Sequence, residues 1–463
     1  MKKKRLSVLS ATAVAAVCLM PATAHASESQ RLMDLLIDKG IISQQEAEAI
    51  RREVETPPTE SRYREGTMYD ATEPVVADET RTRVRRFRTE TVDGSERFGI
   101  RGRLMIDAAR QELNDSTAID SALTKKYGTA IRRARLGALG LINHDWEWQL
   151  EVDYREEEVR MANAYLAYLG VPETRLLFGH VKEPFSMESN TSSRYIMFIE
   201  RATPIDAYRP DREIGFMYES IKPDWYLGAG IFGSGLDLDR EVTEGYSLAM
   251  RGSFAPLLEN DRFVHLGGSV NYRENAYVAR PGEERSYEDI RLRSRLGTRV
   301  IDGRLIGRND LDDTVELMRY GLEFAAGVGP FLVQSEYVRV DATRDRVPDA
   351  TLDGFYIQGS WFLTGERRTY RATHGDFAKV YPNRPFNSLG GTGAWELALR
   401  YATADGIDGT YDGGKMDHYT LGLNWFPHED ITFKFNAIYL DAENAAGNTT
   451  DGWVYALRAQ YEF

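Results

Sequence analysis

The chain has a single cysteine, Cys18, among its 463 residues. This cysteine lies within residues 1–26, which have the parts of a secretory signal peptide: a basic start over 2–5, a short apolar stretch over 6–20, and a small-x-small site that ends at Ala26. We expect export and cleavage after Ala26. The mature chain then has no cysteine, which excludes a disulfide framework and thiol chemistry.

The sequence also lacks a positive net charge and a long apolar run. Its formal charge is -13 at pH 7, and an acidic total argues against a nucleic-acid-binding protein. No stretch after the signal reaches the roughly 20 consecutive apolar residues that a membrane-spanning helix needs. A soluble exported protein and a β-barrel both satisfy this limit, because the strands of a barrel alternate between apolar and polar residues.

Catalytic and metal-binding patterns are missing as well. The histidines are scattered along the chain: His25, His144, His180, His265, His374, His418 and His428. No two of them have the spacing of metal ligands on one element, and no close Ser/His/Asp set accompanies them. The glycine-rich segment 390–393 lacks the strand-then-helix context of a nucleotide-binding loop. We predict no enzyme, no metal site and no cofactor.

The most informative feature that is present is the alternation of residues 453–463. One face carries apolar and aromatic residues: Trp453, Tyr455, Leu457, Ala459, Tyr461 and Phe463. The other face carries Arg458, Gln460 and Glu462, because successive side chains of a strand point to opposite sides. A C-terminal strand with aromatics at both ends is typical of the closing strand of an outer-membrane barrel. An edge strand of a soluble sheet is the alternative.

Similar alternating segments recur from Phe98 to the C-terminus. They are 98–111, 129–142, 145–155, 159–169, 174–181, 213–219, 225–232, 245–255, 262–274, 315–326, 331–342, 351–363, 394–404, 415–426, 431–440 and 453–463. Bacterial single-chain barrels have an even number of strands. We therefore predict an all-β transmembrane barrel of about 16 antiparallel strands over 98–463 in the bacterial outer membrane.

The connections between these segments alternate in length. Short connections suit periplasmic turns, and the long ones 112–128, 182–212 and 275–314 fall at the opposite end. Segment 364–393 breaks this rule, since its position makes it a periplasmic turn although it is long. Loops of that length are usually functional, so we expect a functional role for it.

The N-terminal part of the mature chain has a different character. Residues 27–55 follow helical spacing, with Ser43 and Glu46 as a capping box. Helices this short bury little by themselves, so we expect an oligomerisation module that associates with copies of itself; a loosely ordered periplasmic tail is the alternative. Residues 56–97 are predicted to be a linker with a basic run over 81–88.

Arginines at alternate positions mark segment 290–299. Arg291, Arg293 and Arg295 point to one side of an extended chain, at a repeat of roughly 6–7 Å. Inside a water-filled passage such a row offers an anion successive forked hydrogen bonds. An exposed loop strand with solvated charges remains the alternative.

Further basic residues stand in two other long segments and in one strand. Segment 182–212 carries hydroxyls beside arginines, and hydroxyls donate to an oxyanion without adding charge. Segment 364–393 carries a second cluster, and strand 129–142 carries Arg133 and Arg135 on one face, with Arg132 on the other. The candidate residues of the two segments are Ser192, Ser193, Arg194 and Arg201, and Arg367, Arg368, Arg371 and Lys379.

Several stretches resemble the phosphate-selective porin family, porins O and P of the Gram-negative outer membrane. They are 132–135 with 145–147, 191–193 with 198–201, 293–297, 319–323, 362–367, 393–397 and 461–463. The most distinctive are the Leu-Thr-Gly-Glu and Ala-Trp-Glu-Leu blocks within 362–367 and 393–397. The resemblance covers about 98–463.

The resemblance implies a homotrimer of sixteen-stranded barrels in a bilayer that contains lipopolysaccharide, with the N-terminal module resembling a short coiled-coil segment. Segments 182–212, 275–314 and 364–393 would fold into each pore. It further implies a constriction for phosphate or other small anions, lined by Arg201 and the row of Arg291, Arg293 and Arg295, with Ser192 and Ser193 as neutral donors.

The sequence departs from the family at two places. Met187, Glu188 and Ser189 stand where members with tight phosphate sites have a basic residue, and Asn163 stands where the resemblance predicts an aspartate. Both departures argue for a preference for anions rather than strict phosphate selectivity. The leading hypothesis is an anion-selective diffusion channel; a weakly selective general porin and a non-channel envelope tether or adhesin are the alternatives.

Overall fold

The computed structural model describes residues 87–463, apart from 92–93, 115–119, 156–157, 234–241, 280–283 and 388. The signal peptide, the helical module and nearly all of the linker therefore lie outside the described residues. Within them, no helix is long and apolar enough to cross a bilayer.

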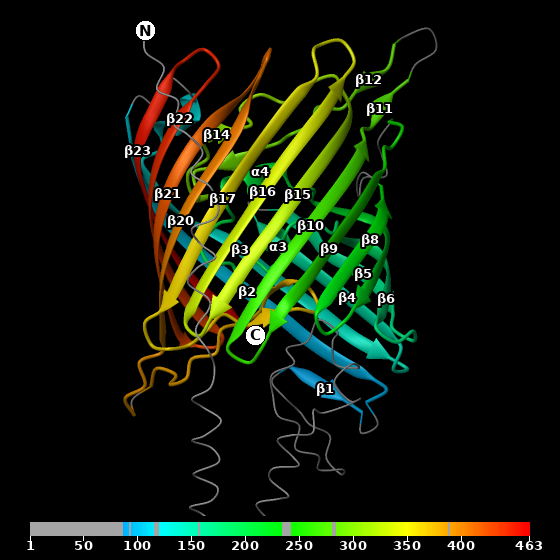
Figure 1. The fold of residues 1–463 in the computed structure, drawn as a ribbon, viewed down its shortest axis with the longest axis vertical. Helices are drawn as coiled ribbons and strands as arrows, with labels where there is room; N and C mark the ends of the chain where they lie inside the picture. Colours follow the sequence, from blue (N-terminus) through cyan, green and yellow to red (C-terminus); the bar gives the residue numbers. More distant parts are fainter. Residues whose placement is uncertain are drawn as a thin grey trace, which may run out of the picture. The chain divides into compact units, whose positions relative to one another are not determined.

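Sixteen antiparallel strands form a closed barrel, because each strand pairs with the next along the chain and the last one, β23, pairs with β2. Figure 1 shows these strands tilted around a common axis. Their bounds are β2 Arg97–Leu113, β3 Tyr127–Ile142, β4 Trp146–Arg155, β5 Glu158–Tyr168, β6 Thr174–Lys182, β7 Arg212–Ile221, β8 Trp225–Phe232, β9 Ser247–Leu258, β10 Arg262–Glu274, β15 Thr314–Val328, β16 Phe331–Arg344, β17 Ala350–Phe362, β20 Ala394–Asp408, β21 Tyr411–His428, β22 Ile431–Glu443 and β23 Thr449–Glu462. The predicted fold and strand number are confirmed.

The two faces of the wall follow the period of two. In β23, Trp453, Leu457 and Tyr461 are exposed on the outside, whereas Val454 and Arg458 are buried against the contents of the barrel. Every barrel strand carries exposed large apolar residues on its outer face. An apolar outer face with polar residues inside is the arrangement that a lipid-embedded barrel requires.

A short extra strand extends the sheet next to the C-terminus. β1 (Arg88–Glu90) pairs with residues 97–99 of β2, just below the last residue of the closing strand. The backbones of Phe463 and Gly102 exchange two hydrogen bonds, of 2.9 and 3.1 Å. We call the rim that carries Phe463 and the β21–β22 turn the lower rim; it lies at the bottom of Figure 1.

A β-bulge changes which way one arginine of β3 points. Ile131 and Arg133 pair with successive residues of β2, so Arg132 is the extra residue. Arg132 is buried and donates to Glu200, from the 183–211 connection, at 2.5 and 2.9 Å. The expectation that Arg132 faces away from Arg133 and Arg135 is wrong, because a bulge interrupts the alternation of side chains.

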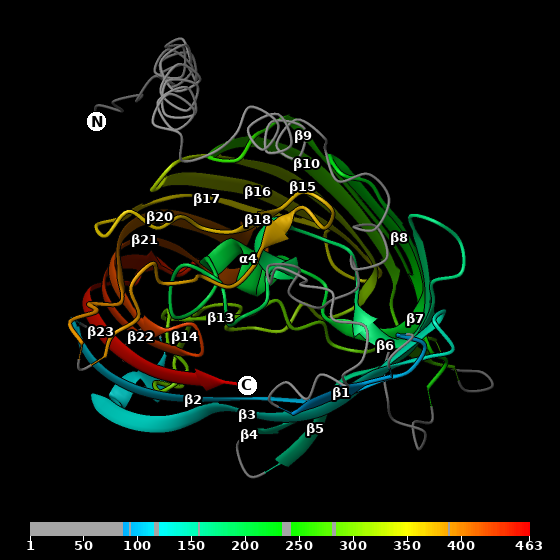
Figure 2. The same ribbon diagram turned by 90° about the horizontal axis from the view of Figure 1, so that it is seen from below.

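Four connections, three of them long, carry the remaining elements. They hold η4 (Ser121–Thr124) in the shorter 114–126 connection, α3 (Met187–Asn190) and α4 (Thr203–Tyr208) in 183–211, β11 (Tyr277–Val278), β12 (Ser286–Tyr287), β13 (Ser294–Arg295) and β14 (Arg304–Ile306) in 275–313, and β18 (Tyr370–Arg371) and β19 (Asp376–Phe377) in 363–393. In Figure 2, which looks into the barrel, α4, β13, β14 and β18 are seen inside the ring of strands. The barrel is therefore partly filled.

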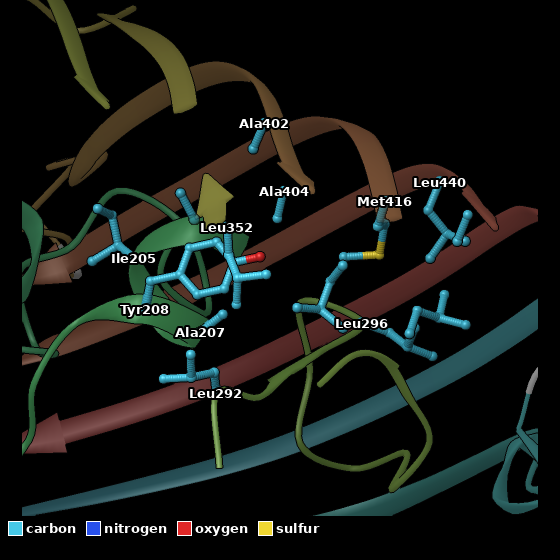
Figure 3. Close-up of a cluster of buried hydrophobic side chains, with 14 of the residues drawn as sticks. Ile205, Ala207, Tyr208, Leu292, Leu296, Leu352, Ala402, Ala404, Met416 and Leu440 are labelled. Carbon is cyan, nitrogen blue, oxygen red and sulfur yellow. The ribbon is translucent and has the colours of Figure 1, made fainter. Parts of the chain in front are cut away.

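An apolar core lies inside the barrel rather than between sheets. Tyr208 of α4 and Leu292 and Leu296 of the 275–313 connection are buried, and they pack with wall residues such as Leu352 and Leu440 (Figure 3). The wall part of this cluster comes mostly from β16, β17 and β20 to β23. Burial of this apolar surface holds both connections against one side of the barrel.

Candidate functional site

The opposite side of the lumen holds a cavity of about 750 Å³, which we call the basic cavity. It extends from the 183–211 connection to the lower rim. Its lining contains nine arginines and lysines, Arg88, Arg101, Arg103, Arg175, Lys182, Arg194, Arg212, Arg371 and Lys379. It contains four acidic residues, Glu219, Asp376, Glu429 and Asp430. Cations thus outnumber acids in the lining although the chain as a whole is acidic.

The excess of positive charge is greatest around one buried carboxylate. Glu151 of β4 accepts from Arg101 and Arg103 of β2, with ion-pair distances of 3.2 and 3.3 Å, and from Arg135 of β3 at 3.2 Å. Arg135 also contacts Asp153 at 2.8 Å. Asp153 is in turn 3.7 Å from Arg133. Four guanidinium groups, those of Arg101, Arg103, Arg133 and Arg135, therefore share two carboxylates, which cannot neutralise them.

Hydroxyl groups of the 183–211 connection border this cluster. Ser193 Oγ accepts a hydrogen bond from Arg103 at 3.0 Å. Ser192 lines the basic cavity, and its Oγ accepts from Arg194 Nε at 3.3 Å. Arg194 also forms an ion pair with Glu462 at 3.1 Å. Both serines thus stand beside guanidinium groups, where a hydroxyl can turn its proton toward an anion.

A neutral amide stands among these charges. Arg212 Nε donates to the side-chain oxygen of Asn163 at 3.0 Å, and the Asn163 amide nitrogen lies 3.5 Å from Glu151. Lys182 donates to the carbonyl of Ser189 at 2.5 Å. Arg212 has one distant acidic partner, Asp211 at 3.9 Å. An aspartate at 163 would add a second and closer carboxylate, whereas the amide adds no charge.

Arg201 is directed at the backbone of its own connection. It donates to the carbonyl oxygens of Glu188, Ser189 and Thr191 at 2.9, 3.2 and 2.9 Å. Burial and then the nearby charge of Arg209 lower the pKa of Arg201 to about 10, so the group is still charged at neutral pH. These contacts fix the turn after α3 that presents Ser192 to the cavity.

The row at 291–295 keeps its predicted alternation but carries acidic partners. Leu292 and Ser294 are buried between the arginines. Arg291 and Arg293 both form ion pairs with Asp310. Arg295 forms one with Asp302 at 2.6 Å. None of these three arginines is in the lining of the basic cavity.

Three further candidates, Arg133, Arg368 and Arg371, also lie beside acidic residues. Arg133 lies 3.7 Å from Asp153. Arg368 is buried and binds Glu396 at 2.8 and 2.6 Å, and Arg371 binds Asp376 at the same two distances. Arg367 is exposed at the lower-rim end of its segment.

Lys379 connects its segment to two acids at the lower rim. Its ammonium group lies 2.9 Å from Asp430 and 3.3 Å from Glu462. Partial burial disfavours the charged form, but the charge of Glu462 outweighs it and raises the pKa of Lys379 above its ordinary value. Lys379 therefore remains a cation in the wall of the basic cavity.

The structure brings together Ser192, Arg194, Arg371 and Lys379 with residues that the sequence analysis did not select. The missed residues are Arg101, Arg103, Arg175 and Lys182, whereas Arg212, which also lines the cavity, belongs to the predicted cluster of hydroxyls and arginines in segment 182–212. A signal for two of them is present, because Arg101 and Arg103 occupy the polar face of the first alternating segment, opposite Ile100 and Leu104.

Comparisons with known proteins place this geometry in context. A family model described as phosphate-selective porin O and P matches residues 98–463. Porin O of Pseudomonas aeruginosa is 28% identical over 423 residues, which cover 81% of this chain and 90% of that protein. An uncharacterised protein of Caulobacter vibrioides is 29% identical over 364 residues, 76% of this chain and 70% of that one.

Solved structures show the same fold at lower identity. An anion-selective porin from Comamonas acidovorans superposes with a TM-score of 0.50 and 12% identity, over 80% of this chain and 100% of that one. The trimer form of OmpT, an outer-membrane protein of Vibrio cholerae, gives the same TM-score, identity and coverage. Because the family model matches residues 98–463, which make up the barrel, this chain belongs to the phosphate-selective porin O and P family and is an outer-membrane porin.

Proposed function

We propose that the chain is an anion-selective channel in which phosphate or a related oxyanion diffuses through the basic cavity. The observation that carries this proposal is the sharing of Glu151 by Arg101, Arg103 and Arg135. An anion that enters supplies the negative charge that this cluster lacks. Guanidinium groups bind oxyanions through parallel, charge-assisted hydrogen bonds.

Selection arises where the passage is narrow enough to strip water from the ion. There, guanidinium groups and the serine hydroxyls replace the hydration shell of an anion, whereas a cation meets repulsion. The acidic partners keep this binding modest, since each guanidinium already donates to a carboxylate. A channel needs such moderation, because a tightly held ion would not leave.

The two departures from the family pattern fit this mechanism. The Glu188 carboxylate is bound by Arg400 at 2.6 Å and by the Ala202 amide at 2.9 Å, so it is turned away from the serines. Asn163 adds no negative charge beside Arg212. The relative named Porin O and the solved anion-selective porin support an anion as the solute; phosphate itself is the finer part of the proposal.

Bilayer recordings of the purified porin test this function. We expect reversal potentials in a potassium chloride gradient to report preference for chloride, and phosphate in the millimolar range to block the chloride current. Arg103→Gln should weaken both effects. Wild-type channels that show neither anion preference nor phosphate block would overturn the proposal.

A further test separates the row at 291–295 from the cavity. We propose that Arg293 adds to the anion preference at the upper part of the lumen and that Arg201 positions the serines. Neutralising Arg201 and Arg293 together should therefore lower the preference, while Arg101, Arg103 and Arg135 retain the rest. Equal chloride-over-potassium selectivity in wild type and double variant would show that these two arginines do not carry it.

The ion pairs of the row favour a second candidate, a weakly selective general porin. Arg291 and Arg293 share Asp310, and Arg295 has Asp302, so these charges are largely balanced. In such a channel the arginines shape the field without binding the solute. Chloride current that phosphate leaves unchanged would favour this reading.

We also propose that the porin is a homotrimer in a bilayer that contains lipopolysaccharide. The shared fold with the trimer form of OmpT supports this assembly. The expected result is a species of three times the monomer mass in light scattering of the detergent-solubilised protein, and a monomer would contradict it.

A further inference from the structure

The segment that joins β17 to β20 contributes a small hairpin to the lumen. β18 and β19 pair through Tyr370 with Phe377 and Arg371 with Asp376. The base of the hairpin is fixed by aromatic packing: Tyr370 stacks on Phe263 of β10, with ring centroids 4.2 Å apart and planes at 6°, and Phe377 is buried. Its base is therefore anchored independently of its tip.

The tip of the hairpin is held by one arginine of the wall. Arg251 of β9 is 0% exposed. It donates to the carbonyl oxygens of His374 and Gly375 at 3.0 and 2.6 Å, and to both oxygens of Glu323 at 2.8 and 2.7 Å. The planar fork of arginine permits this set of bonds, and the single ammonium group of lysine does not.

The hairpin in turn builds part of the basic cavity. Arg371, Asp376 and Lys379 are in its lining. The Arg371–Asp376 pair crosses the hairpin, so the orientation of Arg371 depends on the turn that Arg251 holds. The Phe377 amide also reaches Thr191 Oγ1, at 3.3 Å, in the connection that carries the serines.

We propose that Arg251 is a positioning residue of the channel. It does not line the basic cavity, but it holds the hairpin tip so that Arg371 stands in the cavity wall and the passage stays narrow. Arg251 therefore sets both conductance and anion affinity through the hairpin. The affinity part of this inference rests on the proposed anion selectivity, whereas the conductance part does not.

The main variant removes the buried pair together. Replacing Arg251 alone would leave Glu323 as an unpaired buried charge. Arg251→Met combined with Glu323→Gln avoids this and still removes the donors to the carbonyl oxygens of the tip. Glu323→Gln alone is a comparison variant: Arg251 keeps its bonds to the hairpin but loses its buried counter-ion. Arg251→Lys retains the charge without the fork and should give an intermediate result.

A disulfide provides a rescue in the double-variant background. A Cβ atom at Gly375 would lie 3.0 Å from Cβ of Ser253, somewhat closer than the roughly 3.5–4.5 Å of a disulfide. Ser253→Cys with Gly375→Cys should lock the tip to β9, with some backbone strain at position 375, where φ is +55°. Cys18 is the only natural cysteine and lies before the barrel, so the new pair has no competitor within 87–463.

Single-channel conductance in chloride and the phosphate concentration that halves it are the two readouts. We expect Glu323→Gln to lie closer to wild type than the double variant does in both readouts. The double variant should conduct more and need about tenfold more phosphate, the change for loss of one charge-assisted contact. The oxidised disulfide should restore both values, and reduction should reverse the rescue.

The outcomes separate this inference from the proposed function. Unchanged conductance and block in the double variant would overturn the role of Arg251. Absence of phosphate block in wild type would refute the proposed anion channel, but the conductance comparison would still decide whether Arg251 positions the hairpin. Should the double variant fail to insert, the same two readouts on Arg251→Lys decide, and wild-type values there would overturn the inference.

Discussion

At the scale of single residues, the lumen contains arginines of two kinds. Those of the row at 291–295 have acidic partners of their own, Asp310 and Asp302. Those around Glu151, together with Arg133, are four and share two carboxylates, Glu151 and Asp153. Because the field that an ion meets depends on unbalanced charge rather than on the number of arginines, we propose that the second group is the stronger anion site.

Asn163 offers a direct test of this balance. Asn163→Asp places a carboxylate at the atom that now accepts from Arg212. We expect the preference for anions to fall by about 1 kcal/mol, or roughly fivefold, for one unit charge in a water-filled site. The measurement is the reversal potential in a salt gradient. Asn448→Asp adds the same charge on an exposed loop and should leave it unchanged; equal effects of both variants would contradict the local balance.

Sequence reasoning finds part of this site. Ser192 and Arg194 stand out as hydroxyl beside arginine, and both are at the basic cavity. Arg101, Arg103 and Lys182 were missed because single basic residues on the polar face of a strand look like any lumen-facing residue. Which of them share a carboxylate depends on the register between β2, β3 and β4, which a single sequence does not specify.

At the scale of elements, the connections inside the barrel are held by apolar packing as much as by ion pairs. Leu296 is 0% exposed, in the core that α4 and the 275–313 connection form with the wall. We expect Leu296→Ala to destabilise that connection by about 2–5 kcal/mol. The barrel should still form, and single-channel currents should show larger and noisier openings as the connection leaves the lumen.

The matched control is a leucine on the lipid side of the wall. Leu399 of β20 is 62% exposed, and Leu399→Ala creates no internal cavity. Currents of this variant should equal those of the wild type. Equally quiet currents in Leu296→Ala would show that the connection is held mainly by its polar contacts.

The pH response of the hairpin follows from His374. Burial, followed by the charge of Arg371, lowers the pKa of His374 from 6.5 to about 3. A released hairpin would bind the proton near its ordinary pKa, so its docked state is fully stabilised above 6.5 and loses stability as the pH falls. The loss is about 2 kcal/mol at about pH 5. Asp376 titrates below this range, since its pKa is lowered from 3.8.

Recordings at neutral and acidic pH measure this effect. Wild-type conductance should rise and become noisier near pH 5, as the hairpin tip leaves the cavity. His374→Gln keeps the backbone carbonyl that Arg251 binds and removes the titrating group. A variant that responds to acid as the wild type does would assign the response to another group.

The elements that sequence predicts well are those with a period. Every predicted alternating segment from 98–111 to 453–463 corresponds to one barrel strand, with ends that differ by a few residues. The connections have no period, so their contents, such as α4 and the β18–β19 hairpin, follow from packing against distant strands. A rule of strict alternation likewise does not predict the bulge at Arg132.

At the scale of the whole barrel, the contents divide the lumen. The apolar core occupies the side of β16 to β23, and the basic cavity lies against β2 and β5 to β8. We infer that a solute is directed along one wall. The chain has a net charge of -13, yet cations outnumber acids in the lining of the basic cavity. The two facts are compatible, because the field in an enclosed passage is set by the nearest charged groups.

This contrast in charge predicts how selectivity depends on salt. The Debye length is about 10 Å at 0.1 M and about 3 Å at 1 M, so a preference that comes from the long-range field should vanish in concentrated salt. Direct hydrogen bonds from Arg101, Arg103 and Arg212 act within that shorter distance. We therefore expect reversal potentials to retain anion preference near 1 M potassium chloride, reduced but not abolished. Loss of the preference at high salt, together with absence of phosphate block, would identify a general porin whose arginines only shape the field.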